Sequence, residues 1–139
     1  MKMSVIGTGY LGAVHAACMA HLGHEVVAYD TDASKIAALS GGTSPFYEPG
    51  FDELLAAVLA TGRLRFTQSV HEAVSGASVH FVCVGTPQLA GSDAANIEYV
   101  DSAFRAVAAN ADCAGLVVGK STVPVGTAQR LAAEVAKTS

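Results

Sequence analysis

The feature that most constrains this chain is the turn Gly7-Thr8-Gly9-Tyr10-Leu11-Gly12, which lies between two regular stretches. The apolar residues 3–6 before it predict a strand, and the alanine-rich residues 13–22 after it predict a helix. A second apolar run, residues 25–29, predicts another strand and is followed by Asp30. A strand, a G-x-G-x-x-G turn, a helix, a strand and a terminal carboxylate form the pattern of a dinucleotide-binding βαβ unit.

Each residue of this pattern has a physical role in such a unit. Gly7 allows a tight turn, Gly9 lets a pyrophosphate approach the backbone, and Gly12 lets the helix pack closely on the strand. The free N–H groups and positive dipole end of the helix favour a phosphate. Asp30 is expected to bind ribose hydroxyls and to contribute little to the core. With no arginine directly after it, this acid favours NAD over NADP, because a carboxylate repels a 2′-phosphate.

Composition narrows the class of protein further. The 139 residues predict one domain, and 51% hydrophobic against 14% charged residues suits a parallel sheet that is buried on both faces. A net charge of −4 with few, scattered basic residues argues against a nucleic-acid partner. Residues 3–24 carry no Asp, Glu, Lys or Arg, but the glycine turn and three histidines favour the βαβ unit over a membrane span. We therefore expect a cytoplasmic protein with no membrane partner.

The cysteines and histidines suggest neither a disulfide framework nor a metal site. Cys18, Cys83 and Cys113 are odd in number and far apart; the first two are expected in the core and the third nearer the surface. No basic neighbour marks Cys113 as an activated thiolate. His21 and His24 lack a further ligand nearby, so no metal is expected.

The remainder of the chain alternates between helical and extended patterns. Helices are expected over residues 35–39, 51–60, 70–74, 96–110 and 127–136, and strands over residues 64–67, 79–84 and 116–118. This alternation predicts an α/β Rossmann fold: a doubly wound parallel sheet in three α/β/α layers, with strand order 3-2-1-4-5. Tyr99 is expected to face the core with Val100 and Val107, and Thr127 is expected to be the N-cap of the last helix.

Three polar residues outside the glycine turn lie where a ligand is expected. Thr86 and Thr122 follow two predicted strands, and ligands of open α/β sheets bind beside the carboxyl ends of strands. Lys35 follows Asp30 by five residues. Spacing alone leaves two alternatives for it: a contact to the adenosine end of a dinucleotide, or an ordinary solvated lysine of a helix.

The chain contains four sequence motifs in a specific order: Gly7 to Gly12, residues 44–50 (Ser-Pro-Phe-Tyr-Glu-Pro-Gly), residues 81–87 (Phe-Val-Cys-Val-Gly-Thr-Pro) and residues 120–127 (Lys-Ser-Thr-Val-Pro-Val-Gly-Thr). Together they resemble the amino-terminal domain of the UDP-glucose/GDP-mannose dehydrogenase family over essentially the whole chain. The resemblance implies NAD-dependent oxidation of the C6 alcohol of a nucleotide sugar to a carboxylate, in two hydride transfers. UDP-glucose, converted to UDP-glucuronate, is the expected substrate, with GDP-mannose and UDP-N-acetylmannosamine as alternatives.

The resemblance also implies roles for individual residues. The cofactor-binding set it implies is Gly7, Gly9, Tyr10, Leu11, Gly12, Asp30, Lys35, Thr86 and Thr122. In this set Tyr10 and Leu11 lie at the pyrophosphate, and Lys35 lies near the adenosine ribose. Thr86 and Thr122 line the nicotinamide side, where the Thr122 hydroxyl is expected to lie close to the reacting centre and to order a water.

Residues 1–139 are expected to form only the NAD-binding domain of a longer enzyme. The family's nucleophilic cysteine and its partners belong to a later substrate-binding domain, and Cys113 has neither that motif nor an activating context. The chain alone is therefore expected to be inactive, and the longer enzyme to be a homodimer. A non-catalytic module that senses NAD stays open as an alternative from another class.

Overall fold

A computed structural model describes residues 1–138 of the chain as five strands and six helices. In chain order they are β1 (Lys2–Ile6), α1 (Tyr10–His21), β2 (Glu25–Tyr29), α2 (Ala33–Ser40), α3 (Phe51–Ala60), β3 (Leu64–Thr67), α4 (Val70–Val74), β4 (Val79–Val82), α5 (Glu98–Asn110), β5 (Leu116–Gly119) and α6 (Thr127–Val135). None of these helices is long and apolar enough to cross a bilayer.

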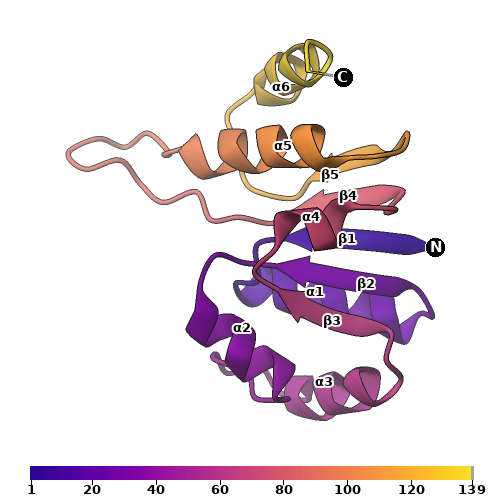
Figure 1. Cartoon of the computed structure of the whole chain (residues 1–139). Coiled ribbons are helices and arrows are strands. Elements are labelled where there is room, and N and C mark those ends of the chain that lie inside the picture. Colours follow the sequence, from indigo (N-terminus) through magenta and orange to yellow (C-terminus); the bar gives the residue numbers. More distant parts are fainter. Residues whose placement is uncertain (139) are drawn as a thin grey trace.

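The five strands form one parallel sheet in the order β3-β2-β1-β4-β5, which confirms the predicted topology (Figure 1). The chain winds from β1 outward to β3 and then crosses back to β4, so the winding direction reverses between β1 and β4. At this point Ile6 is in register with Tyr29 of β2 and with Val82 of β4. Three strands therefore end level with one another, and a crevice beside their carboxyl ends is the usual ligand site of such a sheet.

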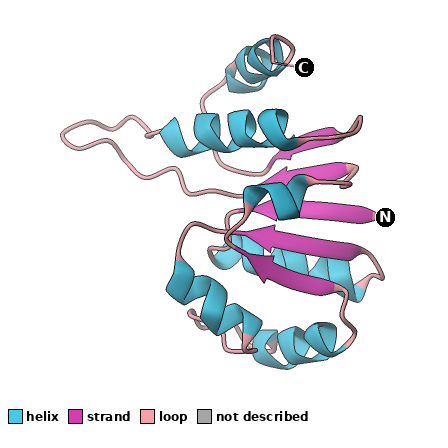
Figure 2. Ribbon diagram, in the orientation of Figure 1, coloured by secondary structure: helices cyan, strands magenta, loops and turns pink. Residues whose placement is uncertain are grey.

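Helices cover both faces of the sheet, as the three-layer prediction requires (Figure 2). Consecutive residues of β1 supply the two cores: Val5 packs with α1 and α3, and Ile6 packs with α4 and α5. On α1 the residues that face the sheet are small, and all are buried: Gly12, Ala13, Ala16, Ala17 and Ala20. Because they are small, this helix lies close to the strands that it covers.

Some finer predictions are wrong, and the structure gives the reason for each. Tyr99 is 58% exposed. The inward face of α5 is formed by Val100, Ala103 and Val107, and Tyr99, one residue before Val100, lies outside this face. Thr127 is not the N-cap of α6. Gly126, with a φ of +91°, holds that position, and Thr127 is the first helical residue and is buried.

The cysteines lie largely where the sequence predicts them. Cys83 is buried, and burial raises the pKa of its thiol to about 11, so it is an inert core residue rather than a nucleophile. Cys113 is exposed, and Cys18 is only half-buried. All three are free thiols.

His80, in the middle of the sheet, makes the stability of the fold depend on pH. His80 on β4 is 1% exposed, and its Nδ1 lies 2.8 Å from the hydroxyl oxygen of buried Ser4 on β1. Its Nε2 is buried with no hydrogen-bond partner among residues 1–138. Burial lowers the pKa of His80 and outweighs the opposing effect of the Asp112 carboxylate. At neutral pH the native state therefore holds this ring uncharged.

We predict that the free energy of unfolding falls as pH drops below about 6.5, because unfolded His80 takes up a proton that the native ring excludes. His80 changes the free energy of unfolding by at most about 1.4 kcal/mol per pH unit. Urea denaturation at several pH values measures it. The variant His80→Leu should have a flatter profile than the wild type, whereas His21→Leu, at an exposed position, should not. An unchanged slope in His80→Leu would contradict this account.

Candidate functional site: the glycine turn and the carboxyl edge of the sheet

The glycine turn (residues 7–12) joins β1 to α1 at the reversal point of the sheet. Gly7 has a φ of +98°, and a Cβ there would lie 3.0 Å from the backbone of Cys83. A Cβ on Gly12 would lie 1.8 Å from the carbonyl oxygen of Gly7. The fold itself therefore favours glycine at both positions. A side chain on Gly7 would be strained by its positive φ and would crowd the backbone that follows β4, and a side chain on Gly12 would overlap the carbonyl group of Gly7.

Gly9 is different, because the fold alone does not require a glycine there. Its φ is −65°, which any residue adopts, and a Cβ built on it would meet nothing within 4 Å. The open space above Gly9 is what a ligand needs in order to approach the backbone closely. Packing therefore gives no reason for a glycine at this position, and the open space is compatible with a ligand.

Four consecutive backbone donors of the turn lack an acceptor. Among residues 1–138 the N–H groups of Gly9, Tyr10, Leu11 and Gly12 form no hydrogen bond, and Ala13 is the first that donates within the helix, to Gly9 O at 2.9 Å. The N-terminus of α1 adds a partial positive charge. Free donors and a helix dipole that point to one place form a site for a phosphate or another anion.

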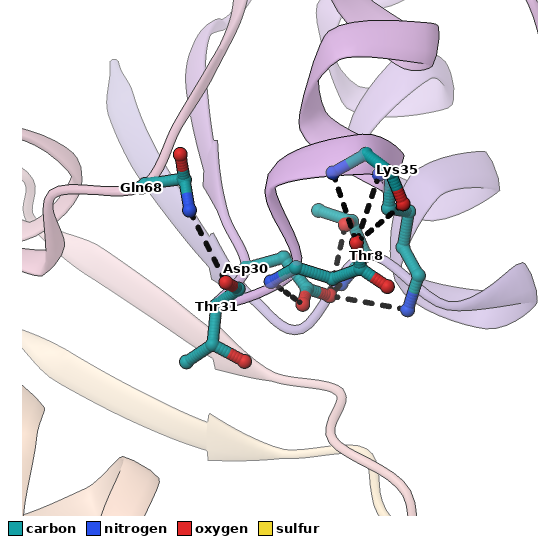
Figure 3. A network of polar contacts seen from close by, with 7 residues as sticks. Thr8, Asp30, Thr31, Lys35 and Gln68 are labelled. Carbon is teal, nitrogen blue, oxygen red and sulfur yellow. Dashed lines mark hydrogen bonds and ion pairs between the residues drawn. The ribbon is translucent and has the colours of Figure 1, made fainter.

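The second strand brings a carboxylate to the same turn. Oδ2 of Asp30 accepts hydrogen bonds from the backbone N–H of Thr8 (2.9 Å) and from its hydroxyl (3.0 Å), and Oδ1 accepts from Asp32 N–H at 3.0 Å (Figure 3). Burial raises the pKa of Asp30, but these hydrogen bonds and the nearby ammonium of Lys35 outweigh it, so the net shift is downward. Asp30 is therefore a fixed anion with acceptor capacity left at Oδ1.

Lys35 lies at this carboxylate, as Figure 3 shows. Its Nζ is 3.5 Å from Oδ2 of Asp30, and the side chain of Asp32 caps α2 by accepting from the N–H groups of Ser34 and Lys35. The cap fixes the helix start from which the lysine reaches back to Asp30. The structure therefore places the lysine beside the carboxylate, and its contact to the adenosine end of a dinucleotide stays a prediction.

Thr86 and Thr122 lie beyond the ends of the neighbouring strands β4 and β5. Val82 and Gly119 are in register, and the Ser121 hydroxyl donates to Val84 O at 2.7 Å, which joins the two segments. Thr86 is half-buried and Thr122 is exposed. Both threonines thus follow strands on one side of the reversal point between β1 and β4, whereas Asp30 follows β2 on the other side.

Sequence reasoning missed two residues of this edge. Thr8 reads as a spacer between glycines, yet it is fully buried and supplies two donors to Asp30. Glu48 of the loop before α3 accepts a hydrogen bond from the hydroxyl of Tyr10. The hydroxyl of Thr8, between two glycines, could have suggested a hydrogen-bonding role from the sequence. No such signal exists for Glu48, because it lies 38 residues from its partner.

Comparison with known proteins decides among the dinucleotide-binding families. Residues 1–139 match the profile described as "UDP-glucose/GDP-mannose dehydrogenase family, NAD binding domain". The chain belongs to this family. Its turn and edge are thus those of an NAD-binding domain, and the unpartnered donors at residues 9–12 and the open space at Gly9 fit the pyrophosphate of NAD.

Particular members of the family are similar to most of the chain. A UDP-glucose 6-dehydrogenase of Rhizobium meliloti (strain 1021) is 48% identical over 127 residues, which are 91% of this chain and 29% of that protein. A GDP-mannose 6-dehydrogenase of Azotobacter vinelandii is 45% identical over 105 residues, 76% of this chain and 24% of that protein. The structure of a UDP-glucose dehydrogenase from the archaeon Pyrobaculum islandicum superposes with a TM-score of 0.92 at 43% identity, covering 99% of this chain and 32% of that one. The chain spans about a third of these relatives or less.

The described residues show no cluster of three or more His, Cys, Asp or Glu side chains that could hold a metal ion.

We predict that Gly9→Ala leaves the fold intact and weakens NAD binding, because its Cβ enters only the space that the pyrophosphate needs. The free energy of unfolding should change by less than about 1 kcal/mol. Gly12→Ala is the matched control. It should unfold or strongly destabilise the protein, since its Cβ overlaps Gly7 O. Urea denaturation and NAD titration measure the two effects, and unimpaired NAD binding by Gly9→Ala would contradict the assignment.

Asp30→Ala is predicted to lower both NAD affinity and stability. It leaves the buried N–H and hydroxyl of Thr8 without acceptors, at a cost of about 1–3 kcal/mol. Because the pKa of Asp30 is lowered in the native state, this stabilisation is complete above about pH 4 and is lost as pH falls further. The difference in stability between wild type and Asp30→Ala should therefore narrow in acid. A difference that is constant with pH would contradict the role of the charge.

Proposed function

We propose that this chain is the NAD-binding part of a UDP-glucose 6-dehydrogenase. The observation that carries the proposal is the 48% identity to the Rhizobium meliloti enzyme, together with free donors, carboxylate and threonines placed around one edge of the sheet. The reaction converts the C6 alcohol and one water to a carboxylate: each of two NAD molecules accepts one hydride, and three protons are released. When bound, NAD supplies the hydride-accepting nicotinamide, and the chain binds and orients it.

In this proposal different residues at the carboxyl edge of the sheet bind different parts of the cofactor. The N–H groups of residues 9–12, including those of Tyr10 and Leu11, bind the pyrophosphate, for which Gly7 and Gly12 shape the turn. Oδ1 of Asp30 accepts from a ribose hydroxyl, and Lys35 holds the carboxylate in its charged form. A 2′-phosphate would meet this anion, which favours NAD over NADP.

Thr86 and Thr122 border the nicotinamide end in the same proposal. Support comes from their position beyond β4 and β5, across the reversal point of the sheet from Asp30. The exposed hydroxyl of Thr122 is free to orient a water or a substrate oxygen beside the reacting carbon. Thr122 is thus the catalytic candidate within this chain.

The substrate-binding half and the nucleophile are proposed to lie outside residues 1–139, in keeping with the length of the relatives. Cys83 has a pKa too high for a nucleophile, and the thiol of Cys113 donates to the carbonyl oxygen of Ala77 and lies beside the carboxylate of Asp112. We further propose a cytoplasmic homodimer for the longer protein, for which the three free thiols and the family likeness are the support.

The test is an assay of the protein encoded by the complete native gene, with NADH absorbance as the readout. UDP-glucose should yield two NADH per molecule, and residues 1–139 alone should bind NAD without turnover. NADH formation with GDP-mannose but not UDP-glucose would overturn the proposed substrate. NAD binding with no turnover on any nucleotide sugar would favour a sensing module instead.

In that protein we predict that Thr122→Val lowers kcat by roughly tenfold or more, because it removes a hydroxyl that orients a reacting group. Thr122→Ser keeps the hydroxyl and should retain most of the activity. Since the side chain is exposed, neither change should alter the unfolding midpoint. Equal kcat values for the valine and serine variants would contradict the role of the hydroxyl.

A further inference from the structure

The loop of residues 43–50 has no role in the proposed function. It contacts Tyr10, which is the first residue of α1 and belongs to the glycine turn. Tyr10 follows the N-cap Gly9, and its side chain is 52% exposed. Its hydroxyl donates a hydrogen bond to Oε2 of Glu48, and this bond raises the pKa of the phenol. Acceptance by a carboxylate makes the bond charge-assisted, and such bonds are stronger than neutral ones.

Aromatic contacts hold the same tyrosine from a second side. Its ring meets the ring of Phe46 edge-on, with centroids 5.3 Å apart and planes at 66°. Phe46 in turn stacks on Phe51 at 5.4 Å and 25°, and Phe51 is 2% exposed within the core beneath α1. The tyrosine is therefore connected to the core through two rings.

The backbone of the loop is fixed as well, so Glu48 is a placed acceptor. The Phe46 N–H donates to the Ser44 hydroxyl oxygen at 3.2 Å, and the Ser44 N–H donates to Oδ1 of Asp52 at 3.3 Å. The carbonyl oxygen of Glu48 accepts from Phe51 N–H at 3.1 Å, which ties the residue to the start of α3. These bonds hold the carboxylate where the tyrosine hydroxyl meets it.

We propose that Glu48 is a positioning residue, which holds the Tyr10 side chain beside the free N–H groups of residues 9–12 and preorganises them for the pyrophosphate. This inference rests on the proposed role of the turn in binding NAD. A side chain ordered before the cofactor arrives does not lose its rotamer freedom on binding, so affinity rises. The Glu48 carboxylate also repels the bound anion, so the inference requires that the gain from the hydrogen bond exceed this repulsion.

The test compares NAD affinities of variants of the 139-residue chain by calorimetry. Tyr10→Phe and Glu48→Ala should each weaken NAD binding about three- to tenfold, the worth of one hydrogen bond. The double variant should bind no more weakly than the weaker single variant, because both changes remove the same bond. Glu48→Gln keeps an accepting oxygen and should stay within about twofold of wild type.

The matched control is Glu53→Ala on α3. This exposed carboxylate has no hydrogen-bond or ionic partner among residues 1–138, so its removal should leave the affinity unchanged. Adenosine, which lacks the pyrophosphate, should bind all variants as it binds the wild type. A general loss of structure would weaken adenosine as well, and thermal unfolding identifies any variant that fails to fold; Tyr10→Phe then carries the test alone.

Several results would overturn the inference. Unchanged or tighter NAD binding by a folded Glu48→Ala protein would show that repulsion equals or exceeds the benefit of the bond. Additive losses in the double variant would show that the two side chains act separately. Failure of the wild-type chain to bind NAD at all would overturn the proposed function, and this inference with it.

Discussion

The contact on which the rest of the structure depends is the approach of α1 to the end of β1. Only a hydrogen atom fits between Gly12 and the carbonyl oxygen of Gly7, where a Cβ would lie 1.8 Å away. The same approach directs the first turn of α1 at the reversal point of the sheet and leaves the donors of residues 9–12 without acceptors. Close packing and an anion site therefore have one cause: a helix that begins directly at the carboxyl edge.

Asp30 holds the glycine turn in place and, in the proposed function, also binds the cofactor. Its Oδ2 satisfies the buried N–H and hydroxyl of Thr8, which fixes the turn to β2, while Oδ1 keeps room for a ribose hydroxyl. Lys35 balances the negative charge without enclosing it, since the lysine side chain is partly exposed. A carboxylate held in this way is already desolvated and oriented, so binding a ribose needs little reorganisation.

The sequence predicts the backbone of this site well and its side-chain partners less well. Strand order, the glycine turn and the strand-end threonines follow from local patterns, because hydrophobic period and glycine position act within a few residues. Glu48 and Thr8 were missed, since each acts through a partner that is distant in sequence. The predictions for Tyr99 and Thr127 are each wrong by one residue. Packing of Val100 sets the inward face of α5, and Gly126, in its left-handed conformation, is the N-cap of α6.

The central claim is that NAD lies across the carboxyl edge, with its pyrophosphate at residues 9–12 and its nicotinamide beside Thr86 and Thr122. Amide chemical-shift mapping of the 139-residue chain tests it most directly, with NAD and with ADP-ribose, which lacks the nicotinamide. Both ligands should shift the amides of residues 9–12, and NAD alone should shift those of Thr86 and Thr122. Shifts confined to the opposite edge of the sheet, or identical patterns for the two ligands, would contradict the account.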